Sequence, residues 1–189
     1  MATTRELLVE TMKQLLWERG YDATSPNLVL ERSGAGKGSF YHHFKGKKEL
    51  AIAAMDARAD ELSEEFDQLV AKHSDPLAAV AAYMCQTRDA AKGCRIGRIV
   101  QDPSLEDPVL NAPLKRFFGE LHDKLRRLFH QAQADRQLSD ALPPDQWATL
   151  TISALQGGFV YGRAMQDGAA VNAATEGFVT LLNTQRLTG

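Results

Sequence analysis

The sequence predicts an all-α protein of about nine helices. Apolar residues recur at helical spacing, strand-like alternation is absent, and capping residues precede successive apolar stretches. We expect a small helical domain at residues 1–50 and a larger helical domain at residues 51–189. The boundary between them is expected at the start of a long helix and not in a linker.

The first two predicted helices are short and have clear end signals. Thr3, with Glu6 three residues later, fits a capping box, and Gly20 fits the position just past the end of this helix. Ser25 and Pro26 suit the N-cap and the first residue of the second helix, because serine accepts from free amides and proline has a helical φ.

The later predicted helices are longer. A fourth helix covers about residues 47–71, and a fifth begins at Asp75-Pro76 and ends near Gly93. The stretch 93–108 contains glycines and prolines and is expected to be a loop around one short helix. A long helix then follows Asp107-Pro108, and the last two helices cover about residues 145–166 and 170–186.

Residues 25–44 have the pattern of a helix-turn-helix, in which a glycine-containing turn joins two short helices. The third predicted helix, residues 37–43, has a slim polar tip that includes Gly36 and Ser39 and fits a DNA major groove about 12 Å wide. Lys37 adds a positive charge at the helix start, where free amides also favour a phosphate.

The aromatic and histidine residues of this third helix divide between two faces. Tyr41, His42 and His43 carry hydrogen-bonding groups suited to the floor or walls of the groove. Phe40 and Phe44 are four residues apart, so they share one face and are expected to pack inward.

The run from Lys37 to Phe44, Lys-Gly-Ser-Phe-Tyr-His-His-Phe, resembles the DNA-binding domain of the TetR family, as does the surrounding stretch 20–50. The similarity covers about 45 residues without gaps. It implies a homodimer that binds operator double-stranded DNA through this motif and carries a ligand-binding and dimerisation domain after it. It also implies that Lys37, Ser39, Tyr41 and His42 face the DNA and that Thr24 and Lys48 hold phosphates. Ser25, Asn27 and Gly36 are further expected DNA contacts.

Two positions depart from the family pattern. Gly36 stands where the family often has Ser or Thr, so one side-chain cap of the third helix is expected to be missing. Pro26 and Asn27 replace a more common apolar and charged pair, which changes the groups available to bases or phosphates.

Charge is distributed unevenly around a net charge of −2. Residues 1–50 hold eight Lys/Arg and six Asp/Glu, whereas residues 51–189 hold fourteen and eighteen. A basic tip on an acidic body suits a DNA-binding protein with a separate effector domain.

Other site chemistries are not expected. The stretch 34–39 has the wrong glycine spacing for a phosphate loop and follows a helix, which argues against an NTPase or a dehydrogenase. No HExxH or CxxC occurs, so we expect neither a metal nor a cofactor, and we do not expect an enzyme. Without an apolar run of about 18 residues or an export signal, a cytoplasmic protein without membrane contact is expected.

The C-terminal domain is expected to bind a small apolar or aromatic effector and to form the dimer. Aromatic rings, three of them with a polar group, and one thiol suggest these pocket residues: Tyr83, Cys94, Phe117, Trp147 and Tyr161. Small and apolar residues in the last two helices suggest this dimer interface: Gly157, Gly158, Gly162, Phe178 and Leu182.

The sequence therefore predicts a ligand-responsive transcriptional repressor. Two alternatives stay open: a helical ligand-binding or enzymatic domain that does not bind DNA, and a repressor that senses oxidants or electrophiles through Cys94, next to Arg95.

Overall fold

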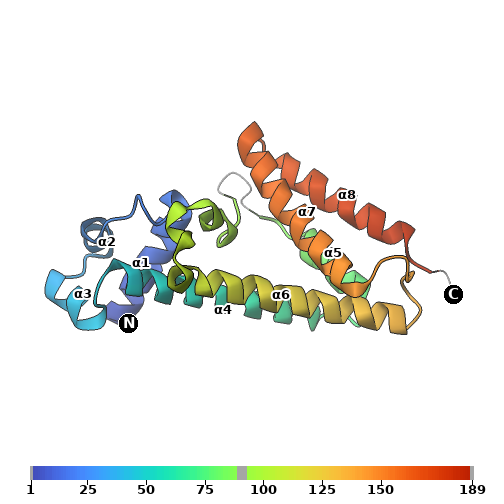
Figure 1. The fold of residues 1–189 in the computed structure, drawn as a ribbon, viewed down its shortest axis with the longest axis horizontal. Helices are drawn as coiled ribbons and strands as arrows, with labels where there is room; N and C mark the ends of the chain where they lie inside the picture. Colours follow the sequence, from blue (N-terminus) through green and yellow to red (C-terminus); the bar gives the residue numbers. More distant parts are fainter. Residues whose placement is uncertain (1, 89–92, 188–189) are drawn as a thin grey trace. The chain divides into compact units, whose positions relative to one another are not determined.

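The computed structural model describes residues 2–88 and 93–187, and its regular secondary structure within these ranges is helical (Figure 1). The α-helices are α1 (Thr4–Arg19), α2 (Pro26–Ser33), α3 (Lys37–His43), α4 (Lys47–Val70), α5 (Pro76–Met84), α6 (Pro108–Ala134), α7 (Pro144–Met165) and α8 (Ala169–Thr184). Two short 3₁₀ helices, η1 (Gly97–Gln101) and η2 (Pro103–Glu106), lie between α5 and α6. The all-α prediction is confirmed.

The ends of the first helices follow the predicted capping chemistry. Thr3 and Glu6 form a reciprocal capping box at the start of α1, and Gly20 ends this helix with φ of +82°. Ser25 Oγ accepts from the amide of Leu28, and Gly34 ends α2 in the left-handed conformation.

The predicted extent of the fifth helix is wrong. This helix ends at Met84, and the described residues 85–88 are not helical. The Arg88 guanidinium folds back and donates to the carbonyls of Met84, at 2.8 Å, and of Tyr83, which satisfies acceptors that a longer helix would use. The rest of the predicted extension, residues 89–92, lies outside the described residues.

The number of helices also differs from the prediction of about nine. The part of the chain that the structure describes has eight α-helices, because the stretch before α6 forms the two 3₁₀ turns instead of one short α-helix. Pro103 begins η2. Because proline has no backbone N–H, it cannot donate the hydrogen bond that would extend η1.

The chain forms two compact units. The first unit comprises Met1–Leu62 and Arg95–Phe117, and the second comprises Ser63–Cys94 and Phe118–Gly189. Helices α4 and α6 therefore each contribute residues to both units. The functional boundary near residue 50 remains our proposal for where the DNA-binding segment ends.

The core of the first unit joins α1 to the helix-turn-helix and to the start of α4. Its buried side chains include Leu8, Met12, Leu15, Val29, Phe40 and Leu50, each with an exposed fraction of 0%. These residues lie at helical spacing on α1 and once on each of the next three helices, so burial of one apolar face fixes the positions of α2 and α3.

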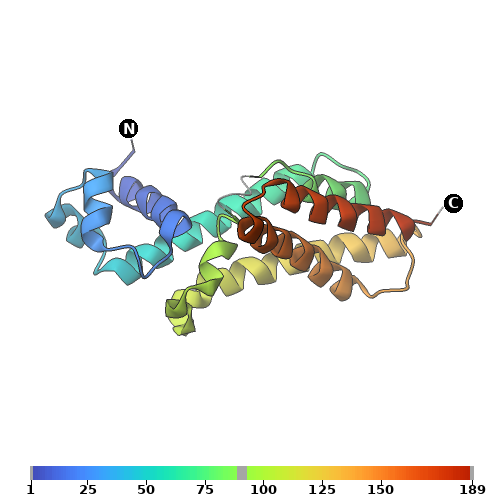
Figure 2. The ribbon, with the colours of Figure 1, turned by 90° about the horizontal axis from the view of Figure 1, so that it is seen from above.

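The second unit is built around α7 and α8, which lie side by side in both views (Figures 1 and 2). A β-carbon on Gly158 would lie 3.1 Å from Cβ of Ala174, and one on Gly162 would lie 2.9 Å from the Asp167 carbonyl oxygen. These two glycines thus permit close approach of the helix pair. Within the described residues, no helix is both long enough and apolar enough to span a membrane.

Candidate nucleic-acid interface and effector-site residues

Two phenylalanines on the inner face of α3 anchor this helix in the first unit. Phe40 is fully buried and Phe44 is 3% exposed, as their spacing predicts. The two rings lie 6.4 Å apart, and the Arg5 guanidinium from α1 sits 5.4 Å from the centre of the Phe44 ring. These contacts hold α3 on α1 without using its outer face.

The outer face of α3 is polar and accessible. Lys37 and His42 are exposed, Ser39 is half-buried, and the Tyr41 ring is 53% exposed. No side chain caps the helix start, because its N-cap residue is Gly36, as the departure from the family pattern predicted. This face presents a cation, a hydroxyl, a phenol and an imidazole together, the groups that contact phosphates and base edges.

The predicted contact residues around α2 have different surroundings. Thr24 is fully buried, and its Oγ1 donates to the Gly20 carbonyl at 2.7 Å, so this side chain stabilises the turn after α1. Ser25 is exposed, although its Oγ is engaged as the cap of α2. Asn27 is exposed on the first turn of α2.

Two lysines at the start of α4 hold neighbouring segments. Lys48 forms an ion pair with Asp107, and this hydrogen bond lowers the pKa of the Asp107 carboxyl. Lys47 donates to the Tyr21 carbonyl at 2.9 Å, and its Nζ lies 3.9 Å from the centre of the Tyr21 ring. A DNA contact by Lys48 would have to compete with Asp107.

The η1 helix and the residue that follows it, Asp102, are hydrogen-bonded to the end of α1 and to the turn after it. The Asp102 carboxylate accepts from the amides of Tyr21, at 2.7 Å, and Asp22, at 3.2 Å. Arg98 Nη1 donates to the Trp17 carbonyl. Local sequence gave no signal for these contacts because the partners are about 80 residues apart.

Hydrogen bonding outweighs burial at Asp102. Burial alone would raise the pKa of this carboxyl, but hydrogen bonds from Ser104 and from the amides of Asp22 and Tyr21 hold it below its ordinary value. The charged carboxylate is therefore the form that binds the α1 turn.

Comparisons with known proteins match both parts of the chain. Residues 8–54 match the family described as bacterial regulatory proteins, tetR family, and residues 74–178 match the tetracyclin repressor-like C-terminal domain. The chain belongs to the TetR family.

Relatives of this TetR-family chain include two regulators from Bacillus subtilis. The uncharacterized HTH-type transcriptional regulator YxaF is 28% identical over 172 residues, which cover 87% of each chain. The HTH-type transcriptional regulator LmrA is 27% identical over 187 residues, covering 94% of this chain and 85% of the relative.

A solved structure shares the fold over almost the whole length. A TetR transcriptional regulator from Chloroflexus aurantiacus has a TM-score of 0.87 and 25% identity, with 98% of this chain and 97% of that chain covered. This TetR-family chain is thus a helix-turn-helix, DNA-binding transcriptional regulator.

The predicted effector residues of this regulator belong to both compact units and differ in how exposed they are. Phe117 belongs to the first unit, where it is 6% exposed, whereas Tyr161 is 59% exposed on α7 in the second. Tyr83 is half-buried on α5, and burial raises its pKa to about 12. Cys94 is half-buried, and its Sγ accepts from Gln156 Nε2 at 3.5 Å.

Trp147 lies at the centre of the second unit. It is 1% exposed, its ring stacks on Phe129 at 5.7 Å, and it meets Phe178 edge-on at 6.3 Å. The indole Nε1 is buried without a hydrogen-bond partner among the described residues. Of the five predicted pocket residues, Trp147 is therefore the one whose buried donor could take a ligand as its hydrogen-bond partner.

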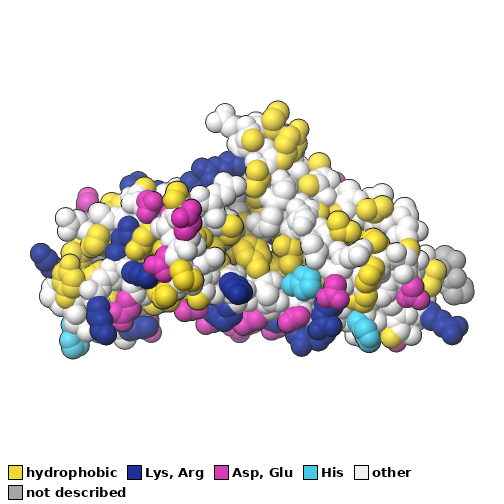
Figure 3. Space-filling model, viewed as in Figure 1, with side chains coloured by type: hydrophobic (Ala, Val, Ile, Leu, Met, Phe, Trp, Pro, Cys, Tyr) yellow, Lys and Arg dark blue, Asp and Glu magenta, His cyan; other side chains and the backbone are white. Residues whose placement is uncertain are grey.

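The predicted dimer residues divide between two faces of the α7–α8 pair. Gly158, Gly162, Phe178 and Leu182 are buried within the chain, whereas Gly157 is exposed with open space where a β-carbon would lie. The exposed apolar side chains of these helices include Leu150, Val160, Met165 and Leu181. Hydrophobic side chains gather over the C-terminal end of α7, at the top of Figure 3.

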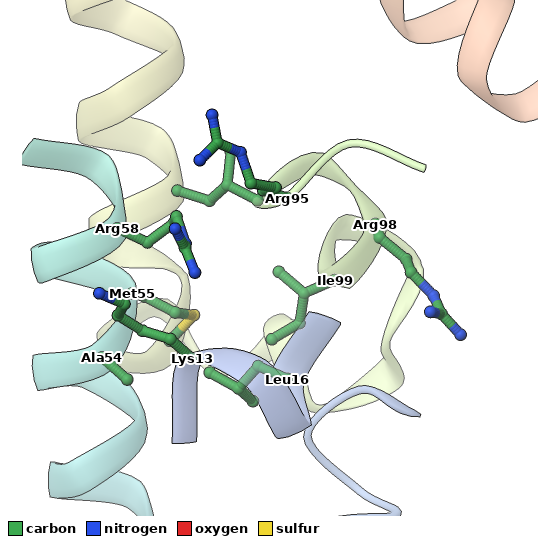
Figure 4. Close-up of a pocket in the computed structure, with 9 residues that line it drawn as sticks. Lys13, Leu16, Ala54, Met55, Arg58, Arg95, Arg98 and Ile99 are labelled. Carbon is green, nitrogen blue, oxygen red and sulfur yellow. The ribbon is translucent and has the colours of Figure 1, made fainter. Parts of the chain in front are cut away.

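A pocket lies in the first unit, between α1, α4 and the segment that carries η1 (Figure 4). Its walls include Leu16 from α1, Met55 from α4 and Ile99 from η1. Sequence reasoning missed this pocket, because its parts are far apart in the chain. The part of the chain that the structure describes contains no cluster of His, Cys, Asp and Glu that would hold a metal ion.

Proposed function

We propose that this regulator is a repressor that binds a palindromic operator as a homodimer and leaves it when a small-molecule effector binds. The observation that carries the proposal is the division of α3 between a buried anchor, Phe40 with Phe44, and an exposed polar face. An α-helix with such a face fits the major groove, and two copies must lie about 34–36 Å apart to meet both half-sites.

In the proposed interface, α3 enters the major groove. Lys37 contacts a phosphate, while Ser39, Tyr41 and His42 face base edges or the sugar-phosphate wall. Gly36 lets the backbone approach closely. Further phosphate contacts come from this set: Ser25, Asn27 and Lys48. Thr24 is omitted as a side-chain contact because its hydroxyl is buried in the turn.

The proposed dimer joins the α7–α8 pairs of two copies into a four-helix arrangement. Leu150, Gly157 and Tyr161 are exposed and follow each other by seven and four residues, so they share one face of α7. Val160, next to Tyr161 on α7, is 56% exposed, and Leu181 on α8 is 53% exposed. Exposed apolar side chains grouped on helices are typical of an interface between proteins.

The proposed effector is a small, partly apolar molecule that binds in the helical region after residue 50. It must bind the DNA-free conformer more tightly than the DNA-bound one, because equal affinity would leave the equilibrium unchanged. A coupling free energy of about 1–3 kcal/mol would lower operator affinity by about 5- to 150-fold. The proposed location is the cytoplasm, where operator DNA is found in a bacterium.

Selection of binding sites from a pool of random DNA duplexes tests the proposal without knowledge of the regulated genes. We expect enrichment of an inverted repeat, a stoichiometry of two chains for each repeat, and affinity that falls steeply with salt. Enrichment of a single half-site bound by one chain would contradict the proposed dimer, and no enrichment at low salt would contradict operator binding.

A further inference from the structure

The pocket of the first unit combines positive charge with apolar walls. Four of its nine lining residues are cationic, namely Lys13, Arg58, Arg95 and Arg98, and none is acidic. The other five are apolar: Leu16, Ala54, Met55, Ile96 and Ile99. Such a lining favours a ligand with an anionic group and a short apolar body.

Two of these cations share an acidic partner that lies outside the lining. Lys13 is 7% exposed and forms ion pairs with Glu10 and Glu61. Arg58 Nη1 donates to Glu61 Oε2 at 2.9 Å, so Glu61 is shared between two cations. Arg98 gives one of its donors to the Trp17 carbonyl, a neutral group.

Arg58 supplies the most specific sign of a ligand. Its side chain reaches from α4 toward the space in front of Ile99 (Figure 4), and the residue is only 8% exposed. Its Nε is buried without a hydrogen-bond partner among the described residues. A buried donor left unpaired is costly, and guanidinium donors match the oxygens of a carboxylate.

We propose that this pocket binds a small aliphatic carboxylate as the effector of the regulator. The carboxylate accepts from Arg58 Nε–H, and the short hydrocarbon body packs against Met55 and Ile99. This inference rests on the proposed function in one respect, namely that a ligand releases the regulator from DNA. It changes the expected ligand from a small apolar or aromatic molecule to an anionic one, and it places the site partly on α1, before residue 50.

The position of the pocket explains how binding would act on DNA affinity. Lys13 and Leu16 belong to α1, against which α3 is packed, and Arg58 belongs to α4, which directly follows the helix-turn-helix. The pocket has room for about one water molecule as it stands, so a larger ligand must widen it. Widening moves α1, α4 and the η1 segment apart, and the ligand thereby favours a conformer different from this one.

The first test measures binding without DNA. Purified full-length protein is titrated with sodium butyrate and, separately, with butyramide, at constant ionic strength and neutral pH, by calorimetry. We expect saturable binding of butyrate and at least tenfold weaker binding of butyramide. Arg58→Met and Arg58→Lys should each weaken butyrate binding about tenfold, since neither retains the Nε–H.

Arg116→Met is the matched control. Arg116 lies on α6 and forms ion pairs with Asp56 and Asp60 of α4, the helix that carries Arg58, but it does not line the pocket. The control should bind butyrate as the parent protein does. If Arg58→Met fails to fold by circular dichroism, Arg58→Lys decides, because it keeps the charge that faces Glu61.

Three results would overturn the proposal: no binding of butyrate at millimolar concentration, equal binding by the Arg58 variants and the control, or inorganic phosphate binding as tightly as butyrate. The second test repeats the operator titration with butyrate present, where about fivefold or greater loss of affinity is expected. Operator binding that ignores butyrate, while Arg58-dependent butyrate binding persists, would refute the effector role alone. Failure of DNA selection would refute the proposed function and leave the carboxylate site standing.

Discussion

The Asp102 carboxylate accepts a 2.7 Å hydrogen bond from the backbone amide of Tyr21, 81 residues earlier in the chain. Tyr21 belongs to the turn between α1 and α2, so the segment between η1 and η2 directly supports the helix-turn-helix.

Asp102→Asn should destabilise the first unit by about 1–2 kcal/mol, because amide-to-carboxylate hydrogen bonds are stronger than neutral ones. The pKa of Asp102 is lowered in the folded protein, so its contribution is present above the unfolded pKa and is lost as pH falls through the folded pKa. Urea unfolding between about pH 7 and pH 2 should show that the unfolding free energies of the parent and the variant become equal at the acidic end. A difference in unfolding free energy that stays constant with pH would show that the charge of Asp102 does not contribute to stability.

Gly20→Ala should cost about 1–3 kcal/mol of unfolding free energy. Gly20 has φ of +82°, and a β-carbon there would lie 2.9 Å from Asp102 Oδ2. Part of this cost should disappear in the Asp102→Ala background, since the close contact is then gone while the backbone strain remains. Thermal unfolding of the parent, the two single variants and the double variant separates the cost of the close contact from the cost of the backbone strain. Additive effects would mean that the Asp102 side chain moves away freely.

Lys37→Ala should weaken binding to the selected operator and lower the slope of log K against log salt by about one unit, as expected for one lost phosphate contact. Lys115→Ala is the control, because Lys115 is an exposed lysine on α6 outside the helix-turn-helix. Fluorescence anisotropy at four or more salt concentrations measures both slopes. If the two variants share one slope, Lys37 does not contact a phosphate.

Val160→Glu should shift the chain from dimer to monomer at micromolar concentration, because the proposed interface would then contain a charge on each copy. Val109→Glu provides a close match, since Val109 is 57% exposed on α6 and Val160 is 56% exposed on α7. Sedimentation velocity should show a dimer for the control only. A dimer in both variants would place the interface away from the α7–α8 pair.

Local signals explain what the sequence could predict. Capping residues and helical periodicity act within about five residues, and they gave the limits of α2 and α3 and the inward packing of Phe40 and Phe44. The end of α5 was missed because it depends on a side chain, Arg88, that folds back on the helix. Propensity rules contain no such contact.

Long-range signals explain what the sequence could not predict. The pocket of the first unit joins residues 13, 58 and 99, and no local pattern brings these together. Thr24 reads as a polar residue at a helix start, yet the fold buries its hydroxyl against Gly20. The glycines of α7 likewise signalled close packing, but only the structure shows that Gly158 and Gly162 face α8 and that Gly157 does not.

The division of α3 into two faces has a consequence for how such a protein diversifies. Phe40 and Phe44 hold the helix, while Lys37, Tyr41 and His42 are exposed and contribute little to the core. Substitutions at the exposed positions therefore change the free energy of unfolding little, whereas most changes in the core of a small domain lower it. Under the proposed operator contacts, the regulator would acquire new target genes by exchanging a few of these surface side chains, and a designer would redirect it by the same exchange with its fold left intact.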